Sequence, residues 1–268
     1  MTTTLATYPP ELARLETLVD AVADRQRQDF GHMASEAKAD GSLITACDRW
    51  SDETIVRGLG DAFPGEGVLS EEGDQHVPIS SAYWVVDPLD GTTNFAAGIP
   101  YWAISIARFE GGLPVWAVLD VPPLRQRIIA VRGQGAWRNG KLLQPPSRQA
   151  DVAGCASLCS RSIGVLQKLP DRRFPGKIRL LGVASLNLVS VAMGQTVAAL
   201  EATPKIWDLA AAWLVLTELE CPIRWLLIDP QDQAPGANLA HTDYPVLAAR
   251  SDSTLETFLP WAKALVAG

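Results

Sequence analysis

Two aspartates, a proline, a glycine and two threonines occupy the segment DPLDGTT, residues 87–93, directly after an apolar run. Pro88 restricts the backbone between Asp87 and Asp90 and has no N–H to satisfy. Neighbouring carboxylates repel each other, and burial raises their pKa values. A divalent cation removes that penalty, and oxygen ligands suit Mg²⁺, Mn²⁺ or Ca²⁺ rather than softer metals. The pair therefore indicates a metal site, to which the backbone carbonyl of Leu89 can contribute.

The residues after Asp90 add groups that bind anions. If a helix starts at Gly91-Thr92-Thr93-Asn94, its free N–H groups and positive dipole end form an anion site. Gly91 lets the backbone approach a phosphate without an intervening Cβ. A metal ion held by the carboxylates on one side and backbone N–H donors on the other could together bind a phosphoryl group. A plain alternative is a hairpin turn at Asp90-Gly91, with Asp87 as a helix cap.

Two further acidic features stand apart in the sequence. Glu71 and Glu72 follow a short apolar run, and Asp208 lies at the start of an apolar helical segment. Taken alone, the glutamates are typical of a solvated turn, and Asp208 of a first-turn helix charge stabilised by the dipole. The metal assignment depends on all three features occurring together.

The first half of the chain predicts helices followed by a sheet. Apolar residues at helical spacing predict an amphipathic helix over 11–30. Residues 38–48 are typical of a polar turn and a short extended segment, after which Asp48 is expected to cap a second helix. The glycine-rich stretch 132–140 lacks the spacing of a dinucleotide-binding loop and is interpreted as turns. Between them, β-branched and aromatic residues predict strands at 83–86, 102–109, 115–119 and 127–131.

The second half alternates between expected strands and helices, which predicts an α/β arrangement. Strands are expected within 154–159, 177–182, 196–200, 222–228 and 244–249, and helices at 185–193, 205–219 and 253–267. We expect one compact unit with an N-terminal α+β lobe, 1–150, and a C-terminal α/β lobe, 151–268, which meet at the segment PPSRQAD, 145–151. The first lobe is expected to carry most of the metal ligands, and the second Asp208 and the substrate wall.

Composition narrows the class of protein. The 268 residues are 47% hydrophobic and 20% charged, with net charge −7 and a pI near 5.0, which disfavours a general nucleic-acid or anionic-membrane surface. No run approaches the roughly 18 apolar residues of a membrane span, and the N-terminus lacks the pattern of a signal peptide. Four cysteines without a paired framework favour reduced thiols in a cytoplasmic protein, and three scattered histidines disfavour a zinc site.

Four segments together resemble the inositol monophosphatase family of metal-dependent, lithium-sensitive phosphomonoesterases. They are TACD at 45–48, SEEG at 70–73, DPLDGTTNF at 87–95 and IWDLAAA at 206–212, and their order and spacing extend the resemblance over nearly the whole chain. The resemblance implies the layered αβαβα sandwich of the inositol monophosphatase and fructose-1,6-bisphosphatase type, usually as a homodimer.

The resemblance also implies roles for single residues. Glu71, Asp87 and the Leu89 carbonyl would hold one Mg²⁺. Asp87, Asp90 and Asp208 would hold a second, and Glu71 with waters would help to hold a third. Thr92 and Asp48 match the pair of residues that activates the attacking water in the family, with Asp48 orienting Thr92. Glu71 would be a further catalytic carboxylate. The backbone N–H groups of Gly91 and Thr92 would hold phosphate oxygens. Lys38 lies in a segment that forms a mobile, metal-responsive loop in the family, although a solvated lysine is the plain alternative.

The alcohol half of the substrate is less closely defined. Asp90, Glu201, Gly182 and Ala184 match substrate-binding positions, whereas Cys159 replaces a serine of inositol-specific members. The first candidate is myo-inositol 1-phosphate. Histidinol phosphate, fructose 1,6-bisphosphate and 3'-phosphoadenosine 5'-phosphate stay open, as does a non-catalytic metal-binding regulatory module. Trp102 and Trp116 are candidates for a dimer face or for the core.

Overall fold

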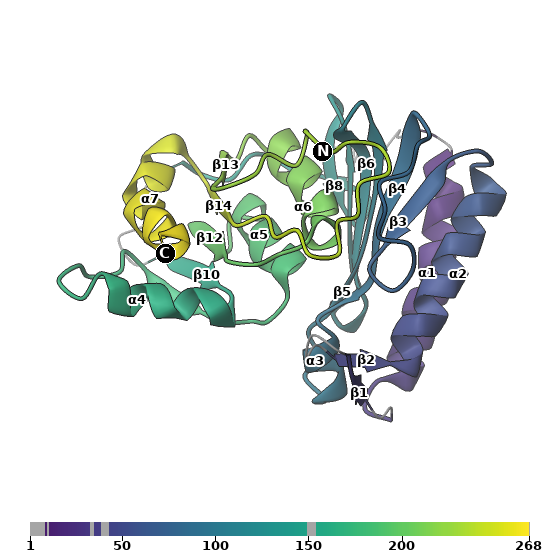
Figure 1. The fold of residues 1–268 in the computed structure, drawn as a ribbon, viewed down its shortest axis with the longest axis horizontal. Helices are drawn as coiled ribbons and strands as arrows, with labels where there is room; N and C mark the ends of the chain where they lie inside the picture. The colour runs from purple at the N-terminus through teal and green to yellow at the C-terminus, as the bar shows by residue number, and fades with distance from the viewer. Residues whose placement is uncertain (1–8, 10, 33–34, 39–42, 149–153, 268) are drawn as a thin grey trace.

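The computed structural model of the protein describes residues 9, 11–32, 35–38, 43–148 and 154–267. Its elements stack in five layers, helix–sheet–helix–sheet–helix, as Figure 1 shows. This confirms the layered αβαβα sandwich expected from the sequence. The first eight residues and residues 149–151 lie outside the described residues, so neither the N-terminal pattern nor the expected lobe boundary is tested there.

The first layer contains α1 (Glu11–Asp29) and α2 (Ala46–Ala62), joined through a small hairpin of β1 (Ser35–Ala37) and β2 (Leu43–Thr45). Each helix buries one apolar face against the other and against the first sheet. The expectation that Asp48 caps α2 is wrong, because Thr45 is the N-cap and Asp48 lies three positions later. The two side chains form a reciprocal capping box, which satisfies backbone N–H groups at both positions.

The first sheet has seven strands, hydrogen-bonded in chain order. They are β3 (Gly67–Ser70), β4 (Ala82–Asp90), β5 (Ala103–Glu110), β6 (Leu113–Val121), β7 (Gln126–Val131), β8 (Gly135–Arg138) and β9 (Lys141–Leu142). β3 is parallel to β4, and the remaining neighbours are antiparallel and form a meander. The interpretation of 132–140 as turns alone is wrong, because β8 pairs with β7 and buries Ala136 and Trp137.

The middle layer is formed by α5 (Ala184–Ala192) and α6 (Ile206–Glu218), which are buried on nearly all sides. Helices that are apolar around their whole circumference need protein on every side, and here a sheet covers each face. Ser105 Oγ on β5 donates a hydrogen bond to the Trp207 carbonyl at 3.1 Å, which fixes the start of α6 against the first sheet.

The second sheet has five strands and mixed pairing. Its order is β11 (Lys177–Arg179), β10 (Cys155–Leu158), β12 (Ala198–Glu201), β14 (Val246–Ala249) and β13 (Ile223–Trp225). β10 is parallel to both its neighbours, whereas β14 is antiparallel to both of its own. The outer layer against this sheet is α4 (Val165–Lys168) and α7 (Asp252–Val266), and two 3₁₀ turns, η1 (Pro122–Leu124) and η2 (Ser160–Gly164), complete the fold.

Two expectations about surfaces can be compared with the structure. Trp102 is 1% exposed and packs between Phe30 and Phe95, so it belongs to the core and not to a dimer face. Trp116 is partly covered by the Arg108 guanidinium, 4.8 Å from its ring centre. Among the described helices, none has the length and apolar character needed to cross a bilayer.

Candidate active site

The segment DPLDGTT bends β4 so that Asp87 and Asp90 lie on the same side. In a regular strand, residues three positions apart point to opposite faces. The pairing of β4 with β5 shifts register between these two residues, which is a β-bulge around Pro88 and Leu89. The Pro88 carbonyl accepts a hydrogen bond of 2.8 Å from the buried amide of Gln26. The bulge therefore directs both carboxylates toward one space.

Gly91 makes the change from strand to helix. Its φ of +103° is strained for any residue with a side chain, and α3 (Thr92–Ala96) begins directly after it. A Cβ at this position would lie 2.8 Å from Val183 Cγ2. This strand-to-helix transition excludes the hairpin turn and the helix cap as explanations of the segment.

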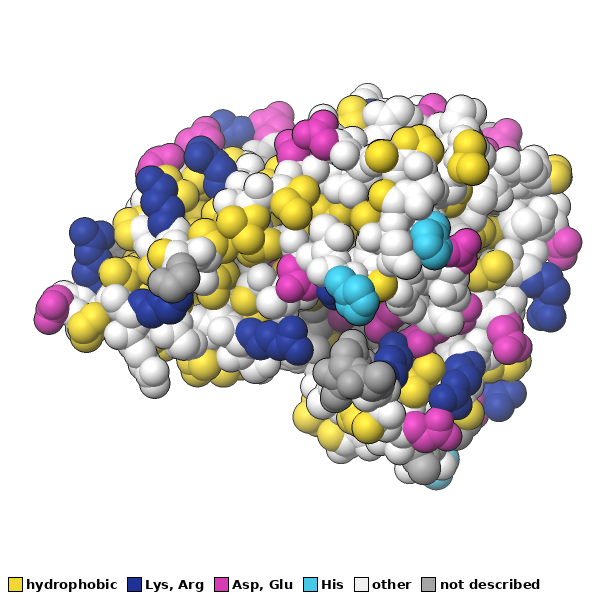
Figure 2. All heavy atoms as spheres, viewed as in Figure 1, with side chains coloured by type: hydrophobic (Ala, Val, Ile, Leu, Met, Phe, Trp, Pro, Cys, Tyr) yellow, Lys and Arg dark blue, Asp and Glu magenta, His cyan; other side chains and the backbone are white. Residues whose placement is uncertain are grey.

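The acidic residues from the three distant segments meet. Glu71, Asp87 and Asp208 each place a carboxylate oxygen within 4.8 Å of the others. These three line a cavity of about 180 Å³, whose wall also contains Leu89, Asp90, Gly91, Thr92 and Gly182. Figure 2 shows acidic side chains gathered in a hollow near the centre of this face of the molecule.

The pKa values of this cluster reflect burial and the repulsion between its carboxylates. Burial, and then the neighbouring carboxylates, raise the pKa of Asp87 and of Asp208 well above the usual range. Burial raises the pKa of Asp90 to about 6 and also raises that of Glu71. Asp87 Oδ2 is buried and has no hydrogen-bond partner among the described residues. An unpartnered oxygen within a set of hard oxygen donors fits a divalent cation.

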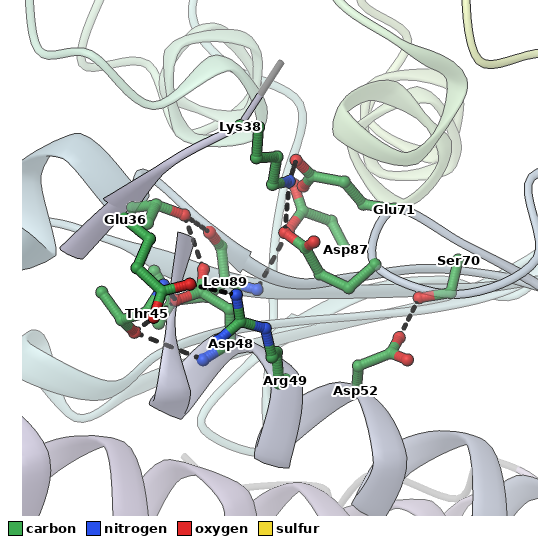
Figure 3. A network of polar contacts seen from close by, with 12 residues as sticks. Glu36, Lys38, Thr45, Asp48, Arg49, Asp52, Ser70, Glu71, Asp87 and Leu89 are labelled. Carbon is green, nitrogen blue, oxygen red and sulfur yellow. Dashed lines mark hydrogen bonds and ion pairs between the residues drawn. The ribbon is translucent and has the colours of Figure 1, made fainter. Parts of the chain in front are cut away.

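Lys38 lies against this cluster. Its Nζ is 3.1 Å from Glu71 Oε1 and 2.6 Å from Glu72 Oε1, and Figure 3 shows it pointing toward the carboxylates. Burial raises the pKa of Glu72 to about 7. The side chain of Lys38 is only 23% exposed, so the alternative of a solvated lysine is wrong.

Thr92 and Asp48 form a hydrogen-bonded pair beside the carboxylates. Thr92 Oγ1 lies 2.7 Å from Asp48 Oδ1 and 3.1 Å from the Leu89 carbonyl, and its single proton can serve one acceptor at a time. Asp48 Oδ2 accepts from the Thr45 N–H at 2.8 Å and from the Thr45 hydroxyl. Figure 3 shows Thr45 and Asp48 of this capping box side by side. The box occupies Oδ2 and leaves Oδ1 of Asp48 to Thr92.

A second cavity of about 210 Å³ adjoins the first and shares Asp90, Gly182 and Asp208 with it. Its wall includes Ala184 and Glu201, the remaining predicted substrate positions. Glu201 lies at the end of β12, is 2% exposed, and has a pKa that burial raises to about 8. Glu201 Oε1 accepts a hydrogen bond from Asn187 Nδ2 at 2.8 Å.

Several residues of the two cavities were not predicted from the sequence. Asn187 Oδ1 is buried, and the described part of the chain offers it no hydrogen-bond partner. The Ser185 N–H donates to Asp90 Oδ2 at 2.8 Å and so ties α5 to the first cavity. Arg161 lines the second cavity and donates to Thr203 Oγ1 at 2.8 Å. Polar residues within an otherwise apolar helix, as in ASLNLVSVA, are the signal that identifies Ser185 and Asn187.

Comparison with known proteins agrees with this geometry. The model of the inositol monophosphatase family matches residues 11–236. The chain belongs to this family. Several of its members are named phosphatases, and the chain is accordingly a phosphomonoester hydrolase of the inositol monophosphatase family.

Individual members of the inositol monophosphatase family show how broad the resemblance is. The histidinol-phosphatase of Mycobacterium tuberculosis is 33% identical over 215 residues, covering 75% of this chain and 82% of the relative. The inositol-1-monophosphatase of Mesorhizobium japonicum is 33% identical over 227 residues, covering 77% and 83%. The structure of an inositol monophosphatase/NADP phosphatase complexed with Mg²⁺ and phosphate superposes with a TM-score of 0.78 at 25% identity, covering 95% of this chain and 94% of that one.

Proposed function

We propose that this phosphatase hydrolyses a small polyol phosphate monoester with the help of Mg²⁺, and that myo-inositol 1-phosphate is the first candidate. The observation that carries the proposal is the meeting of Glu71, Asp87 and Asp208 around an unpartnered Asp87 oxygen, beside the Thr92–Asp48 pair. Nothing in the fold itself requires mutually repelling carboxylates, one of them fully buried, at this place. Binding of a cation by these carboxylates explains why they lie together.

The residues present can hold two ions and assist a third. Glu71, Asp87 and the Leu89 carbonyl would hold the first, and Asp87, Asp90 and Asp208 the second; Glu71 would assist a third. When bound, Mg²⁺ supplies Lewis-acid stabilisation of the charge that develops on the phosphoryl and leaving-group oxygens. The fit rests on hard oxygen donors whose pKa values are raised by burial and by one another.

The protein supplies proton transfer and orientation. In the proposed reaction, the Thr92 hydroxyl takes a proton from the attacking water while its own proton passes to Asp48 Oδ1, 2.7 Å away. Glu71 borders the same cavity and helps to orient the water. The backbone N–H groups of Gly91 and Thr92 are proposed to hold phosphate oxygens, where the absence of a Cβ at Gly91 permits close approach.

The second cavity is proposed to bind the alcohol half. Glu201, Asn187 Oδ1 and Asp90 make its wall rich in hydrogen-bond acceptors, which suits a substrate that offers several hydroxyl donors. Gly182 and Ala184 leave room for a ring. The same acceptors suit an ammonium group, so histidinol phosphate is the second candidate, and the relative named histidinol-phosphatase supports it.

Other expectations stay proposals. We propose a homodimer, lithium sensitivity, a cytoplasmic location and the division into two lobes, on the family resemblance and composition. Fructose 1,6-bisphosphate, 3'-phosphoadenosine 5'-phosphate and a non-catalytic metal-binding module are the alternatives that the following experiment separates. Sedimentation of the purified protein tests the dimer.

The experiment measures phosphate release with Mg²⁺ from inositol 1-phosphate, histidinol phosphate, fructose 1,6-bisphosphate and 3'-phosphoadenosine 5'-phosphate. Asp90→Asn is expected to lose turnover, because it removes a buried ligand charge. Asp232→Asn is the control, since it changes an exposed carboxylate outside both cavities. Turnover by wild type and the control only, fastest on inositol 1-phosphate, is the expected result. No turnover of any substrate despite Mg²⁺ binding would contradict the proposal and favour the non-catalytic module.

A further inference from the structure

A long segment from the C-terminal half reaches the loop that carries Glu71. Residues 229–244, here called the strap, connect β13 to β14, and Figure 1 shows this segment passing over α6 toward the β3–β4 edge of the first sheet. There it pairs with residues 75–77 through three backbone hydrogen bonds. The Val77 N–H donates to the Ala237 carbonyl (2.9 Å), the Gly236 N–H to Val77 (2.8 Å), and the Leu239 N–H to Gln75 (2.9 Å).

This contact is anchored in the core. Val77 and Leu239 are each 3% exposed and belong to the main apolar cluster of the molecule. At the surface, His76 pairs with Asn238 as an isolated antiparallel bridge. A backbone ladder over buried side chains restrains the strap far more than exposed polar contacts do. Residues 75–77 are therefore held at a fixed place relative to the C-terminal half.

From this ladder the side chain of Gln75 reaches the backbone of Glu71. Gln75 Nε2 donates to the backbone carbonyl of Glu71 at 2.6 Å. The Glu71 N–H donates to Val86 on β4 at 3.1 Å, so the strap and the first sheet hold the Glu71 backbone from two sides. The strap is thus linked to the backbone of Glu71 through Gln75.

The other end of the strap contacts the start of α6. The Tyr244 N–H donates to the Pro204 carbonyl at 2.9 Å, and Asp243 Oδ1 lies 2.9 Å from Lys205 Nζ. The Lys205 N–H in turn donates to Asp208 Oδ2 at 2.7 Å. Both side chains of the Lys205–Asp243 pair are partly exposed, at 25% and 42%, so this ion pair contributes less than the backbone contact.

We propose that the strap sets the distance between Glu71 and Asp208, and that Gln75 is a positioning residue for the metal cluster. Glu71 follows β3 in the first sheet, whereas Asp208 lies on α6 in the middle layer, so their spacing depends on how the two halves dock. The strap contacts residues 75–77, which follow Glu71 closely, and residues 204–205, which precede Asp208 closely. The inference rests on the proposed function, because the spacing matters when the two groups share bound cations.

The test is Mg²⁺ binding by calorimetry without substrate, on wild type, Gln75→Ala and Gln75→Glu. Loss of the hydrogen bond to the Glu71 carbonyl is expected to weaken Mg²⁺ binding about 2- to 10-fold. Gln75→Glu keeps the shape but removes the donor, so it is expected to weaken binding at least as much. In both variants the Mg²⁺ concentration for half-maximal rate is expected to rise, while kcat at saturating Mg²⁺ changes little.

Gln231→Ala is the matched control, since it truncates an exposed glutamine of the same strap. It is expected to bind Mg²⁺ as wild type does, and Asp243→Asn is expected to show a smaller loss than Gln75→Ala. A lowered melting temperature with unchanged Mg²⁺ affinity in both Gln75 variants would overturn the positioning role and leave the proposed function intact. Absence of Mg²⁺ binding by the wild type would instead overturn the proposed function, and this inference with it.

Discussion

Replacing Asp48 by asparagine separates catalysis from folding at the proposed site. The new side chain can keep a carbonyl oxygen toward the Thr45 N–H, which Asp48 Oδ2 accepts from at 2.8 Å in the wild type. Its NH₂ group then faces Thr92 Oγ1, which can accept because its own proton can turn to the Leu89 carbonyl at 3.1 Å. Every hydrogen bond is retained, but the one between Thr92 and residue 48 reverses direction. The hydroxyl can no longer pass its proton to residue 48.

The magnitudes follow from this reversal. The stability cost is mainly the lost charge in the first turn of α2, about 0.3–1 kcal/mol. For a chain of this size that lowers the melting temperature by roughly 1–4 °C. Loss of the proton acceptor is expected to lower kcat about 10²- to 10⁴-fold.

The assay is steady-state phosphate release at saturating Mg²⁺ together with thermal unfolding. Ser251→Ala is the control for stability, because Ser251 caps α7 far from the two cavities and accepts from the Thr254 N–H at 3.2 Å. Its loss costs about 0.5–2 kcal/mol and is expected to leave kcat unchanged. A kcat for Asp48→Asn within a few-fold of wild type would refute the role of Asp48 as proton acceptor.

Three further predictions concern the carboxylates and the turn. The pKa of Asp90 in the folded protein is raised from 3.8 to about 6, so the metal-free protein loses stability as the pH rises through this range. Bound Mg²⁺ offsets the cost of the ionised carboxylate. Mg²⁺ should therefore raise the melting temperature more at pH 8 than at pH 5. Glu201→Gln keeps an acceptor for Asn187 but replaces the other carboxyl oxygen by an NH₂ group, so steady-state kinetics should show KM for the polyol phosphate rising about tenfold or more with a smaller change in kcat. Gly91→Ala adds a Cβ 2.8 Å from Val183 at φ +103°, so denaturant unfolding should show a loss of at least about 1–2 kcal/mol.

Local sequence signals predicted much of the site because its chemistry is concentrated in short segments. The apolar residues at 83–86 predicted a strand, and the structure has it as the first part of β4; the helix considered after Gly91 is present as α3. The helical periodicities around Val19 and Leu214 correctly predicted buried faces. Such patterns depend only on residues close together in the sequence, so a single sequence is enough to recognise them.

The features that the sequence did not predict depend on pairings between distant segments. The bulge in β4 is defined by its register with β5, and β8 is a strand because β7 lies beside it. Asp48 was assigned as a cap because aspartate favours that position, yet Thr45 takes it and Asp48 completes the box. The pairing of residues 75–77 with the strap joins segments more than 150 residues apart, which no local pattern encodes.

The most direct test of the account is Asp87→Asn, measured for both metal-free stability and Mg²⁺-dependent phosphate release. The asparagine oxygen can keep the 3.0 Å hydrogen bond from the Leu89 N–H, and its NH₂ group replaces an oxygen that has no partner in the described chain. That group faces carboxylates, so one repulsive charge becomes a hydrogen-bond donor. The account predicts a higher melting temperature without metal and loss of phosphate release. Phosphate release close to that of wild type would contradict it.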